Sequence, residues 1–266
     1  MKHLQMEIKD QIAVITLDNP PQNRMDLQML DDFEDALHDL IYSDARVLVI
    51  RGEGDIFTYG GYFPEWIDME THKVRALVSR WISVVNRIEH LSFPVIASIN
   101  GPCWGGGFEF TLASDIVLAS PNATFNHPEK TIAITTLLGG IYRFAERVGK
   151  NIAGEMAYTA KPLSAERMNQ LGVVNQVVER EKLDGETTAL AREIADGPAS
   201  AHAAHKALLR LWSQCGRTAA DEALLDLSMP LFDTEDVKIA LSAAKEALDN
   251  GTPRKNLKFT SGSCFG

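Results

Sequence analysis

The residues best suited to chemistry lie between Asn100 and Glu129, where an apolar strand sequence runs into Gly105–Gly107 and a helix is predicted to begin. Without Cβ atoms, the backbone at these glycines can approach a ligand closely. The unpaired N–H groups of a helix N-terminus favour developing negative charge. The stretch therefore predicts an oxyanion hole, with the alternative that the glycines only let the helix pack tightly on the strand.

Two carboxylates in this stretch could move protons. Glu109 follows the glycines in the first helical turn, between apolar Phe108 and Phe110. Such surroundings raise a carboxyl pKa unless the group is partnered, which suits general acid–base work. The alternative is a charge partner for the helix dipole. Glu129, which follows His127–Pro128 in a predicted loop, reads in isolation as a solvated carboxylate.

A second candidate is the loop from Asp55 to Trp66, which surrounds Gly60–Gly61 with aromatic side chains after an apolar strand. Its aromatic residues are Phe57, Tyr59, Tyr62, Phe63 and Trp66. Loops at the carboxyl ends of parallel strands are where α/β proteins bind ligands. The loop therefore predicts a wall of an apolar pocket, or alternatively a loop that only caps the core.

The elements that must position these residues alternate between strands and helices. Periodicity predicts a hairpin over 6–8 and 12–17, and helices over 27–41, with Asp26 as N-cap, and 73–91. It predicts further strands at 45–51, 94–100, 115–119, 124–125 and 172–178. Helical patterns otherwise dominate from Gly139, and the tail from about Glu186 is almost entirely helical. This order predicts a mainly parallel α/β core followed by a helical C-terminal segment.

Composition narrows the function classes. The 266 residues carry a formal charge of −10, with a pI near 5.2, which argues against binding nucleic acid or an anionic membrane surface. No run approaches the roughly 18 apolar residues of a membrane span, and the N-terminus has no apolar signal region. Cys103, Cys215 and Cys264 are far apart, which fits a reducing compartment, so a soluble cytoplasmic protein is expected. The sequence has no nucleotide-binding glycine motif, and no GxSxG elbow for an α/β-hydrolase serine. It has neither HExxH nor a CxxC metal spacing, so no metal is expected.

Taken together, the segments resemble the crotonase superfamily, that is, enoyl-CoA hydratase/isomerase-like proteins. The resemblance spans nearly the whole chain in order and spacing. The matching segments are Pro21–Asn23, Arg51–Gly61, Pro94–Gly101, Gly105–Glu109, Ser114–Ile116, Phe125–Glu129, Gly139–Arg143, Val148–Gly149 and Leu171–Val174. The resemblance implies a crotonase (ClpP-like) α/β fold of repeated ββα units over residues 1–195. A helical segment over 196–266 would then pack at the interface of a homotrimer or a dimer of trimers.

The resemblance also implies a site and a reaction. The backbone N–H groups of Gly61 and Gly106 would hold the thioester oxygen of an acyl-CoA and stabilise an enolate. Glu109 would orient and deprotonate the attacking water, and Glu129 would protonate the α-carbon. Coenzyme A would enter only as part of the substrate, with no separate cofactor, in acyl-CoA and fatty acid metabolism. The expected substrate-binding residues are Asn23, Arg24, Tyr59, Gly60, Tyr62, Trp66, Gly105, Pro128, Thr136 and Leu137.

The chain departs from the family pattern in three places. Tyr62 stands where an acidic residue often follows the oxyanion glycine. In Lys130–Leu138, which lines the acyl pocket in relatives, Ala133 and Thr136 stand at the family's glycine and proline positions. On the C-terminal helix, Ala244 and Ala247 stand where a phenylalanine and a lysine usually lie near the CoA phosphates. Arg24 is the candidate for a compensating cation.

Four hypotheses remain open from the sequence. The first is a lyase that hydrates an enoyl-CoA, which retention of both Glu109 and Glu129 favours over a second, a one-carboxylate isomerase. The third is a hydrolase that cleaves a C–C bond of a β-diketone without CoA, which the altered 130–138 segment and nearby His127 favour. The fourth is a non-catalytic binding protein on a trimer-forming scaffold, against which the intact glycines and carboxylates argue.

Overall fold

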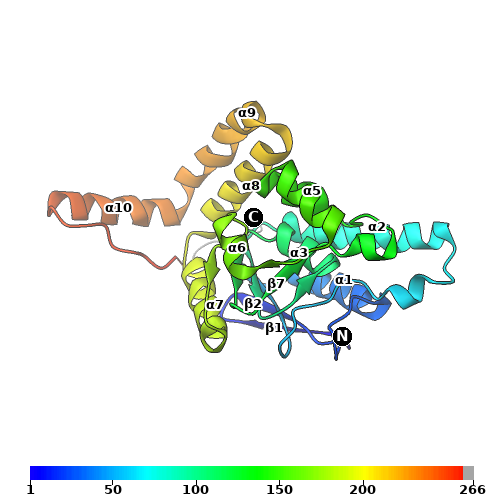
Figure 1. Cartoon of the computed structure of the whole chain (residues 1–266). Helices are drawn as coiled ribbons and strands as arrows, with labels where there is room; N and C mark the ends of the chain where they lie inside the picture. Colours follow the sequence, from blue (N-terminus) through cyan, green and yellow to red (C-terminus); the bar gives the residue numbers. More distant parts are fainter. Residues whose placement is uncertain (260–266) are drawn as a thin grey trace. The chain divides into compact units, whose positions relative to one another are not determined.

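The computed structural model describes residues 1–259, so Cys264 lies outside the described residues. The chain divides into two compact units (Figure 1). One consists of Met1–Leu91 and Val95–Ala191, and the other of Ser92–Pro94 and Arg192 onward. Within the described residues, no helix is long and apolar enough to cross a membrane.

The first unit is built on a six-stranded sheet in the order β1-β2-β3-β4-β6-β9. Its strands are β1 (Leu4–Lys9), β2 (Ile12–Leu17), β3 (Val47–Gly52), β4 (Val95–Ile99), β6 (Ile116–Ala119) and β9 (Gln176–Val177). Only the β1–β2 pair is antiparallel; all later neighbours in this sheet are parallel. The two residues of the hairpin turn, Asp10 and Gln11, both have positive φ, as the tight turn matching strand twist requires.

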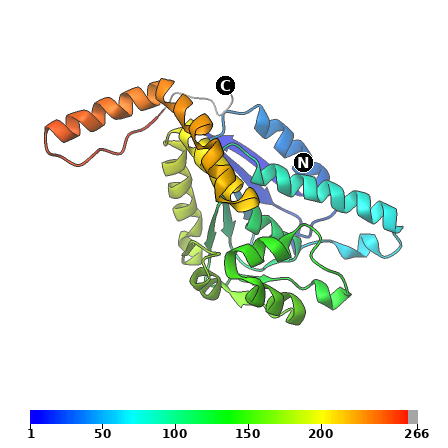
Figure 2. The ribbon, with the colours of Figure 1, turned by 90° about the horizontal axis from the view of Figure 1, so that it is seen from above.

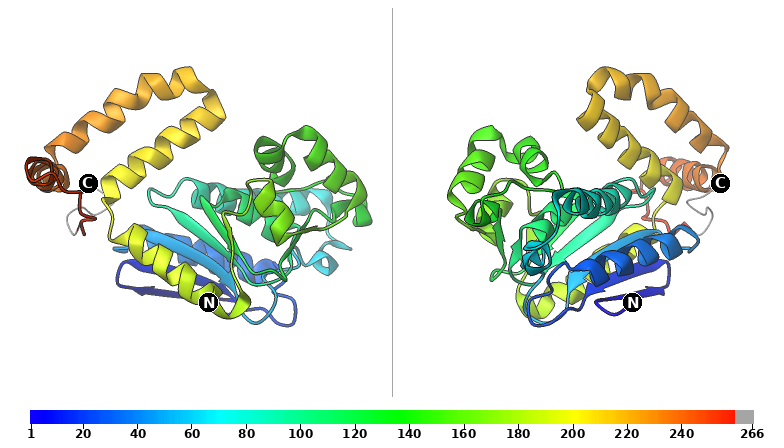
Figure 3. Two further views of the ribbon diagram at one scale, coloured as in Figure 1. Left: turned by 60° about the vertical axis from the view of Figure 1, so that its left-hand side comes forward. Right: turned by 90° about the vertical axis from the view of Figure 1, so that its right-hand side faces the viewer.

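Apolar β3 and β4 lie in the middle of this sheet, where both faces of a parallel strand are covered. In both views of Figure 3, α1 (Leu27–Ile41) lies on one face and the start of α7 (Arg180–Ala195) on the other. A second, three-stranded sheet has the order β5-β7-β8. Its strands are β5 (Cys103–Trp104), β7 (Thr124–Asn126) and β8 (Leu163–Ser164). The predicted α/β fold class is confirmed.

Three helices are joined through an aromatic cluster. Asp26 begins α1 as predicted, because its carboxylate accepts the N–H of Met29 at 2.8 Å. Phe33 of α1 then stacks on Phe110 of α3 (Gly106–Ala113), with ring centroids 5.0 Å apart. It also meets the edge of Trp81 on α2 (Thr71–Glu89) at 6.0 Å, and Figure 2 shows α1 and α2 side by side. The cluster fixes α3, which carries Glu109, against two longer helices.

The remaining helices of this unit are α4 (Gly140–Val148), α5 (Lys150–Thr159) and α6 (Ala165–Gln170), with 3₁₀ turns η1 (Phe63–Trp66) and η2 (Glu129–Ile132). The strand predicted over 172–178 is shorter than expected, since only Gln176–Val177 pairs. Gly172 has φ +77°, and the N–H groups of Val173 and Val174 donate to the Met168 carbonyl. These apolar residues therefore close the end of α6 instead of extending the strand.

Beyond residues 92–94, the second unit contains α8 (Ala199–Cys215), α9 (Arg217–Ser228), η3 (Met229–Asp233) and α10 (Glu235–Asp249). Figure 3 shows α8 and α9 as an antiparallel pair. Lys206 of α8 is buried and donates to the carbonyl of Phe93 at 3.1 Å. Large apolar side chains of this unit remain exposed, among them Leu209, Trp212, Leu225, Phe232, Leu241 and Leu248.

Candidate active site

A cavity of about 410 Å³ lies within the first unit and contains both candidate carboxylates. The aromatic loop contributes Tyr59, Phe63 and Trp66 to its wall, α2 contributes Leu77, Val78 and Trp81, and the 131–138 segment contributes Ile132, Ile134, Leu137 and Leu138. Gly61, Gly105 and Gly106 lie in the same wall as Glu109 and Glu129. The cavity therefore combines a mostly apolar wall with a few convergent polar groups, as ligand sites commonly do.

Glu109 is almost completely buried, and two backbone N–H groups hold its carboxyl group in place. Its Oε1 accepts the N–H of Leu138 at 2.9 Å and the N–H of Gly140 at 2.7 Å. Burial raises the pKa of Glu109 to about 7, and the nearby charge of Glu129 acts in the same direction, while the two N–H donors oppose it. A carboxyl group with a pKa near neutrality can accept or release a proton at physiological pH. Within residues 1–259, no hydrogen bond reaches its second oxygen, Oε2.

Glu129 begins η2, directly after Pro128, and its side chain is only 12% exposed. Its Oε1 lies against Gly105, where an added Cβ would stand 3.4 Å from that oxygen. Its Oε2 is buried without a hydrogen bond in the described part of the chain. Burial raises the pKa of Glu129 to about 7. The prediction, made from this residue in isolation, of a solvated carboxylate is wrong, because the side chain is largely buried beside Gly105 and His127.

The backbone N–H groups of Gly61 and Gly106 are free of hydrogen bonds to residues 1–259. Gly106 is the first residue of α3, where helix N–H groups have no partner within the helix. The two backbones approach closely, because an added Cβ on Gly60 would lie 3.1 Å from the Gly106 nitrogen and 2.8 Å from the Trp104 carbonyl. Only glycine tolerates that approach together with the φ of +79° observed at Gly60. Two neighbouring N–H groups without partners among residues 1–259 are the donors that the predicted oxyanion hole requires.

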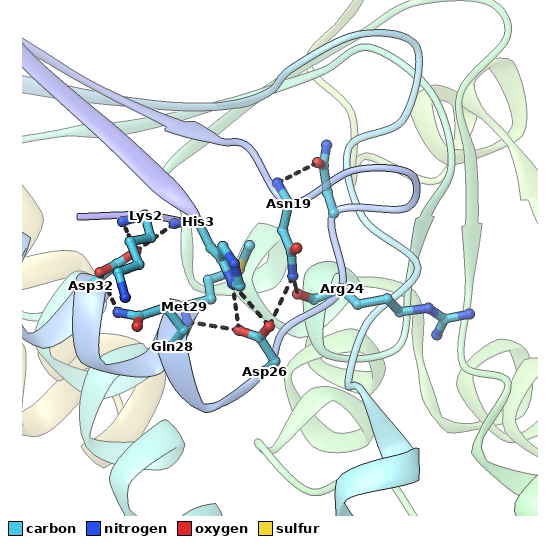
Figure 4. A network of polar contacts seen from close by, with 9 residues as sticks. Lys2, His3, Asn19, Arg24, Asp26, Gln28, Met29 and Asp32 are labelled. Atoms are coloured by element: carbon cyan, nitrogen blue, oxygen red, sulfur yellow. Dashed lines mark hydrogen bonds and ion pairs between the residues drawn. The ribbon is translucent and has the colours of Figure 1, made fainter.

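Arg24 supports the loop that carries Gly61. Its guanidinium donates to the Tyr59 carbonyl at 2.6 Å and lies 5.5 Å from the Tyr59 ring centroid and 6.0 Å from that of Phe63. The Arg24 carbonyl accepts the side-chain amide of Asn19, which also donates to the N-cap Asp26 (Figure 4). This network connects the start of α1 to the aromatic loop.

The structure brings six of the ten predicted substrate-binding residues into the cavity wall: Arg24, Tyr59, Trp66, Gly105, Pro128 and Leu137. The other four lie outside it. Asn23 is buried and donates to the carbonyls of Glu53 and Ile56, and Thr136 accepts the N–H of Ile141 at the start of α4. Gly60 faces the Gly105–Gly106 backbone, and Tyr62 is exposed.

Sequence reasoning missed the contribution of α2 to this cavity. Leu77, Val78 and Trp81 fall on an apolar helical stripe, which is indistinguishable in sequence from any core-facing stripe. It also missed the role of Gly140 as a donor to Glu109. Among the described residues, no group of three or more His, Cys, Asp or Glu side chains is arranged to hold a metal ion.

The family model described as enoyl-CoA hydratase/isomerase matches residues 7–251. The chain belongs to this family. As an enoyl-CoA hydratase/isomerase family member, and so a crotonase, it is 31% identical to the short-chain-enoyl-CoA hydratase of Clostridium acetobutylicum, over 90% of this chain and 92% of that one. It is 29% identical to the crotonyl-CoA hydratase of Syntrophomonas wolfei, over 91% and 94%. The crystal structure of an enoyl-CoA hydratase from Bacillus anthracis superposes with a TM-score of 0.86 at 25% identity, covering 96% and 98%.

Gly61, Gly105, Gly106 and the two glutamates, which the resemblance to this family singled out, line one cavity. In this crotonase the left-handed Ala133, with φ +58° and ψ +34°, occupies the family's glycine position. The backbone conformation that favours glycine is therefore kept without the glycine.

Proposed function

We propose that this protein is a hydro-lyase that adds water across the double bond of a 2-enoyl-CoA thioester. The observation that carries the proposal is the convergence, in one cavity, of two carboxyl groups whose pKa is raised to about 7 and two backbone N–H groups that have no partner among residues 1–259. Conjugate addition needs a base, an acid and stabilisation of enolate charge, and this set supplies all three.

Each group has a distinct role in the proposed reaction. The N–H groups of Gly61 and Gly106 hold the thioester oxygen and receive the negative charge that develops on it. Glu109, fixed through Oε1 by Leu138 and Gly140, offers Oε2 to the attacking water and takes its proton. Glu129 gives a proton to the α-carbon. Placing both carboxyls beside one substrate accounts for a large part of the rate through orientation.

The acyl group and the remaining partners follow from the wall of the cavity. Trp66, Trp81 and Ile134 favour an uncharged apolar acyl group, and the relatives named for short-chain-enoyl-CoA and crotonyl-CoA support a short one. Coenzyme A would enter as part of the thioester, without a further cofactor. The aromatic face of Tyr59 and the guanidinium of Arg24 lie in the wall and are available to this larger group.

We also propose that the protein acts as a homotrimer or a dimer of trimers. The proposal is supported by the exposed apolar side chains of α8, α9 and α10, since clustered apolar side chains in water commonly mark an interaction surface. We propose that further copies of this chain cover these side chains, and sedimentation velocity measures the resulting assembly directly. The free thiols of Cys103 and Cys215 support a cytoplasmic location.

The test of the substrate class is calorimetric titration with CoA, acetoacetyl-CoA and a CoA-free β-diketone, followed by a hydration screen across acyl lengths. The proposal expects acetoacetyl-CoA to bind more tightly than the diketone, and hydration to favour short enoyl groups. Binding and C–C cleavage of the diketone, without binding of the thioester, would replace the lyase with the hydrolase hypothesis. The two retained carboxylates and the named hydratase relatives favour the lyase.

A further inference from the structure

His127 is a buried polar side chain that the proposed reaction does not use. It follows β7, is 1% exposed and does not line the cavity. Phe108 and Phe144 pack against its ring, with centroids 4.7 Å and 6.0 Å away. Neither Nδ1 nor Nε2 makes a hydrogen bond of ordinary geometry to the described residues, although the Gly140 carbonyl lies near the ring. A purely structural core histidine normally satisfies at least one ring nitrogen.

The nearest carboxylate to this ring is Glu129. His127 Nδ1 lies 3.8 Å from Glu129 Oε2, which is itself buried without a hydrogen bond. Two unsatisfied groups, one able to donate and one able to accept, thus face each other just beyond hydrogen-bond range. Hydrogen bonds in active sites are often long without substrate and tighten when the reacting complex forms.

We infer that His127 is a positioning residue, whose Nδ1–H donates to Oε2 of Glu129 and leaves Oε1 to carry the proton that goes to the substrate. Oε1 is the oxygen that lies against Gly105, beside the oxyanion donor Gly106. The inference rests on the proposed hydration for the role of Glu129, while the contact itself depends only on the geometry.

The surroundings keep the imidazole neutral, so it donates without adding a charge. Burial lowers the pKa of His127 to about 4, and the Gly140 carbonyl near the ring offsets this only in part. Gly140 also leaves room for the ring, because an added Cβ would lie 2.5 Å from His127 Cε1 and 2.6 Å from Glu109 Cγ. The same glycine therefore packs between the histidine and the other carboxylate.

Burial is the largest influence on the titration of Glu129, and charged or titratable groups stand on several elements around it. These are Glu109 on α3, His127 after β7, Lys130 on η2, Arg143 on α4, and Arg24 and Tyr59 in the cavity wall. Arg143 is paired with Glu89, and Arg24 with the Tyr59 carbonyl. Loss of the His127 donor disfavours ionised Glu129 and so raises the pKa of Glu129. Because the reaction requires protonated Glu129, the alkaline limb of the rate profile then moves to higher pH.

The experiment compares His127→Phe, which keeps an aromatic ring but has no donor, with His127→Asn, whose amide approximates Nδ1. We expect His127→Phe to lower kcat on crotonyl-CoA about tenfold with little change in KM. Its alkaline limb should move upward by about one pH unit, with the melting temperature kept or raised. His127→Asn should keep most of the wild-type kcat and most of the wild-type position of the alkaline limb. Wild-type kcat and pH profile in His127→Phe, or equal loss in the two variants, would overturn the inference.

A second measurement does not depend on turnover. Solid-state NMR of the protein labelled with ¹⁵N-histidine should show His127 with its proton on Nδ1, and the Nδ1 signal should change in Glu129→Gln. A proton on Nε2, or an Nδ1 signal that ignores Glu129→Gln, would overturn the inference even if His127→Phe fails to fold. If the wild type hydrates no enoyl-CoA, the proposed function fails, and the NMR result still decides the contact.

Discussion

The N–H of Gly140 donates to Oε1 of Glu109 across 2.7 Å, which connects the first residue of α4 to a carboxylate on α3. The same oxygen accepts from Leu138, so two backbone dipoles hold one buried carboxyl in place. These two bonds orient Glu109 toward the cavity, and among the described residues no charged side chain makes a hydrogen bond to it. Such a base can retain a pKa near 7, which a directly bonded arginine would lower.

Replacing either carboxylate should stop the reaction while leaving the fold intact. Glu109→Gln and Glu129→Gln should each lower kcat by about 10²- to 10⁴-fold, the usual contribution of a positioned acid or base. Steady-state hydration of crotonyl-CoA measures the loss, with exposed Glu155→Gln as the control. Near-normal turnover in either cavity variant would rule out the two-carboxylate mechanism.

The burial of Glu109 also predicts a dependence of stability on pH. The folded-state pKa is raised from 4.5 to about 7, so the unfolded chain loses its proton first as pH rises. The stabilisation from protonated Glu109 is complete below about pH 4.5 and is lost as pH approaches 7. Above about pH 7, the ionisation of buried Glu109 lowers the free energy of unfolding by about 3 kcal/mol.

Glu109→Gln removes this titration. Between pH 4.5 and 7.5, the free energy of unfolding of Glu109→Gln should therefore rise by about 3 kcal/mol relative to that of the wild type. Urea unfolding at each pH measures this difference. Glu155→Gln again serves as the control. A difference between Glu109→Gln and the wild type that stays constant across this range would contradict the raised pKa.

Gly140 should tolerate no side chain. A Cβ there would meet Glu109 Cγ at 2.6 Å and His127 Cε1 at 2.5 Å, so Gly140→Ala should displace the carboxylate and lower kcat about 100-fold. Gly185 in α7 is the matched control, because an added Cβ meets nothing within 4 Å. Gly185→Ala should leave kcat unchanged and stabilise the fold by about 0.5–1 kcal/mol. Equal activity of the two variants would refute the packing argument.

Ala133 offers a stabilising change next to the site. Its left-handed conformation strains an alanine, so Ala133→Gly should raise the free energy of unfolding by up to about 1 kcal/mol, after the extra flexibility of unfolded glycine is subtracted. Ala160 has a similar conformation at the end of α5 and should respond in the same way. Thermal denaturation of the two variants tests this, and a clear loss of stability at both positions would contradict the strain.

The sequence predicted the parts of the fold that depend on local patterns. The N-cap at Asp26, the hairpin and the apolar strands β3 and β4 follow from capping chemistry and hydrophobic period, and the structure has them. The strand expected over 172–178 is confined to Gln176–Val177, because the left-handed Gly172 turns the apolar Val173–Val174 pair back onto α6. Local periodicity cannot distinguish a strand from a buried helix end of this kind.

The candidate site was predictable mainly through the family resemblance. Membership of the family is confirmed, and the roles of the site residues stay predictions. The burial of Glu129 depends on packing against residues distant in the sequence, such as Gly105, and no local signal marks that contact. The Leu77–Trp81 wall depends likewise on the packing of α2 beside the cavity. The assignment of residues 196–266 to an oligomer interface stays a prediction.

The central claim is that this cavity adds water to a carbon–carbon double bond conjugated to a thioester. The most direct test is incubation of the wild-type protein with crotonyl-CoA in ¹⁸O-labelled water, with the product identified by mass spectrometry. Hydration by this cavity predicts 3-hydroxybutyryl-CoA carrying one ¹⁸O atom, formed by the wild type and not by Glu109→Gln. Unchanged crotonyl-CoA, or a product in which only the double bond has moved, would contradict it.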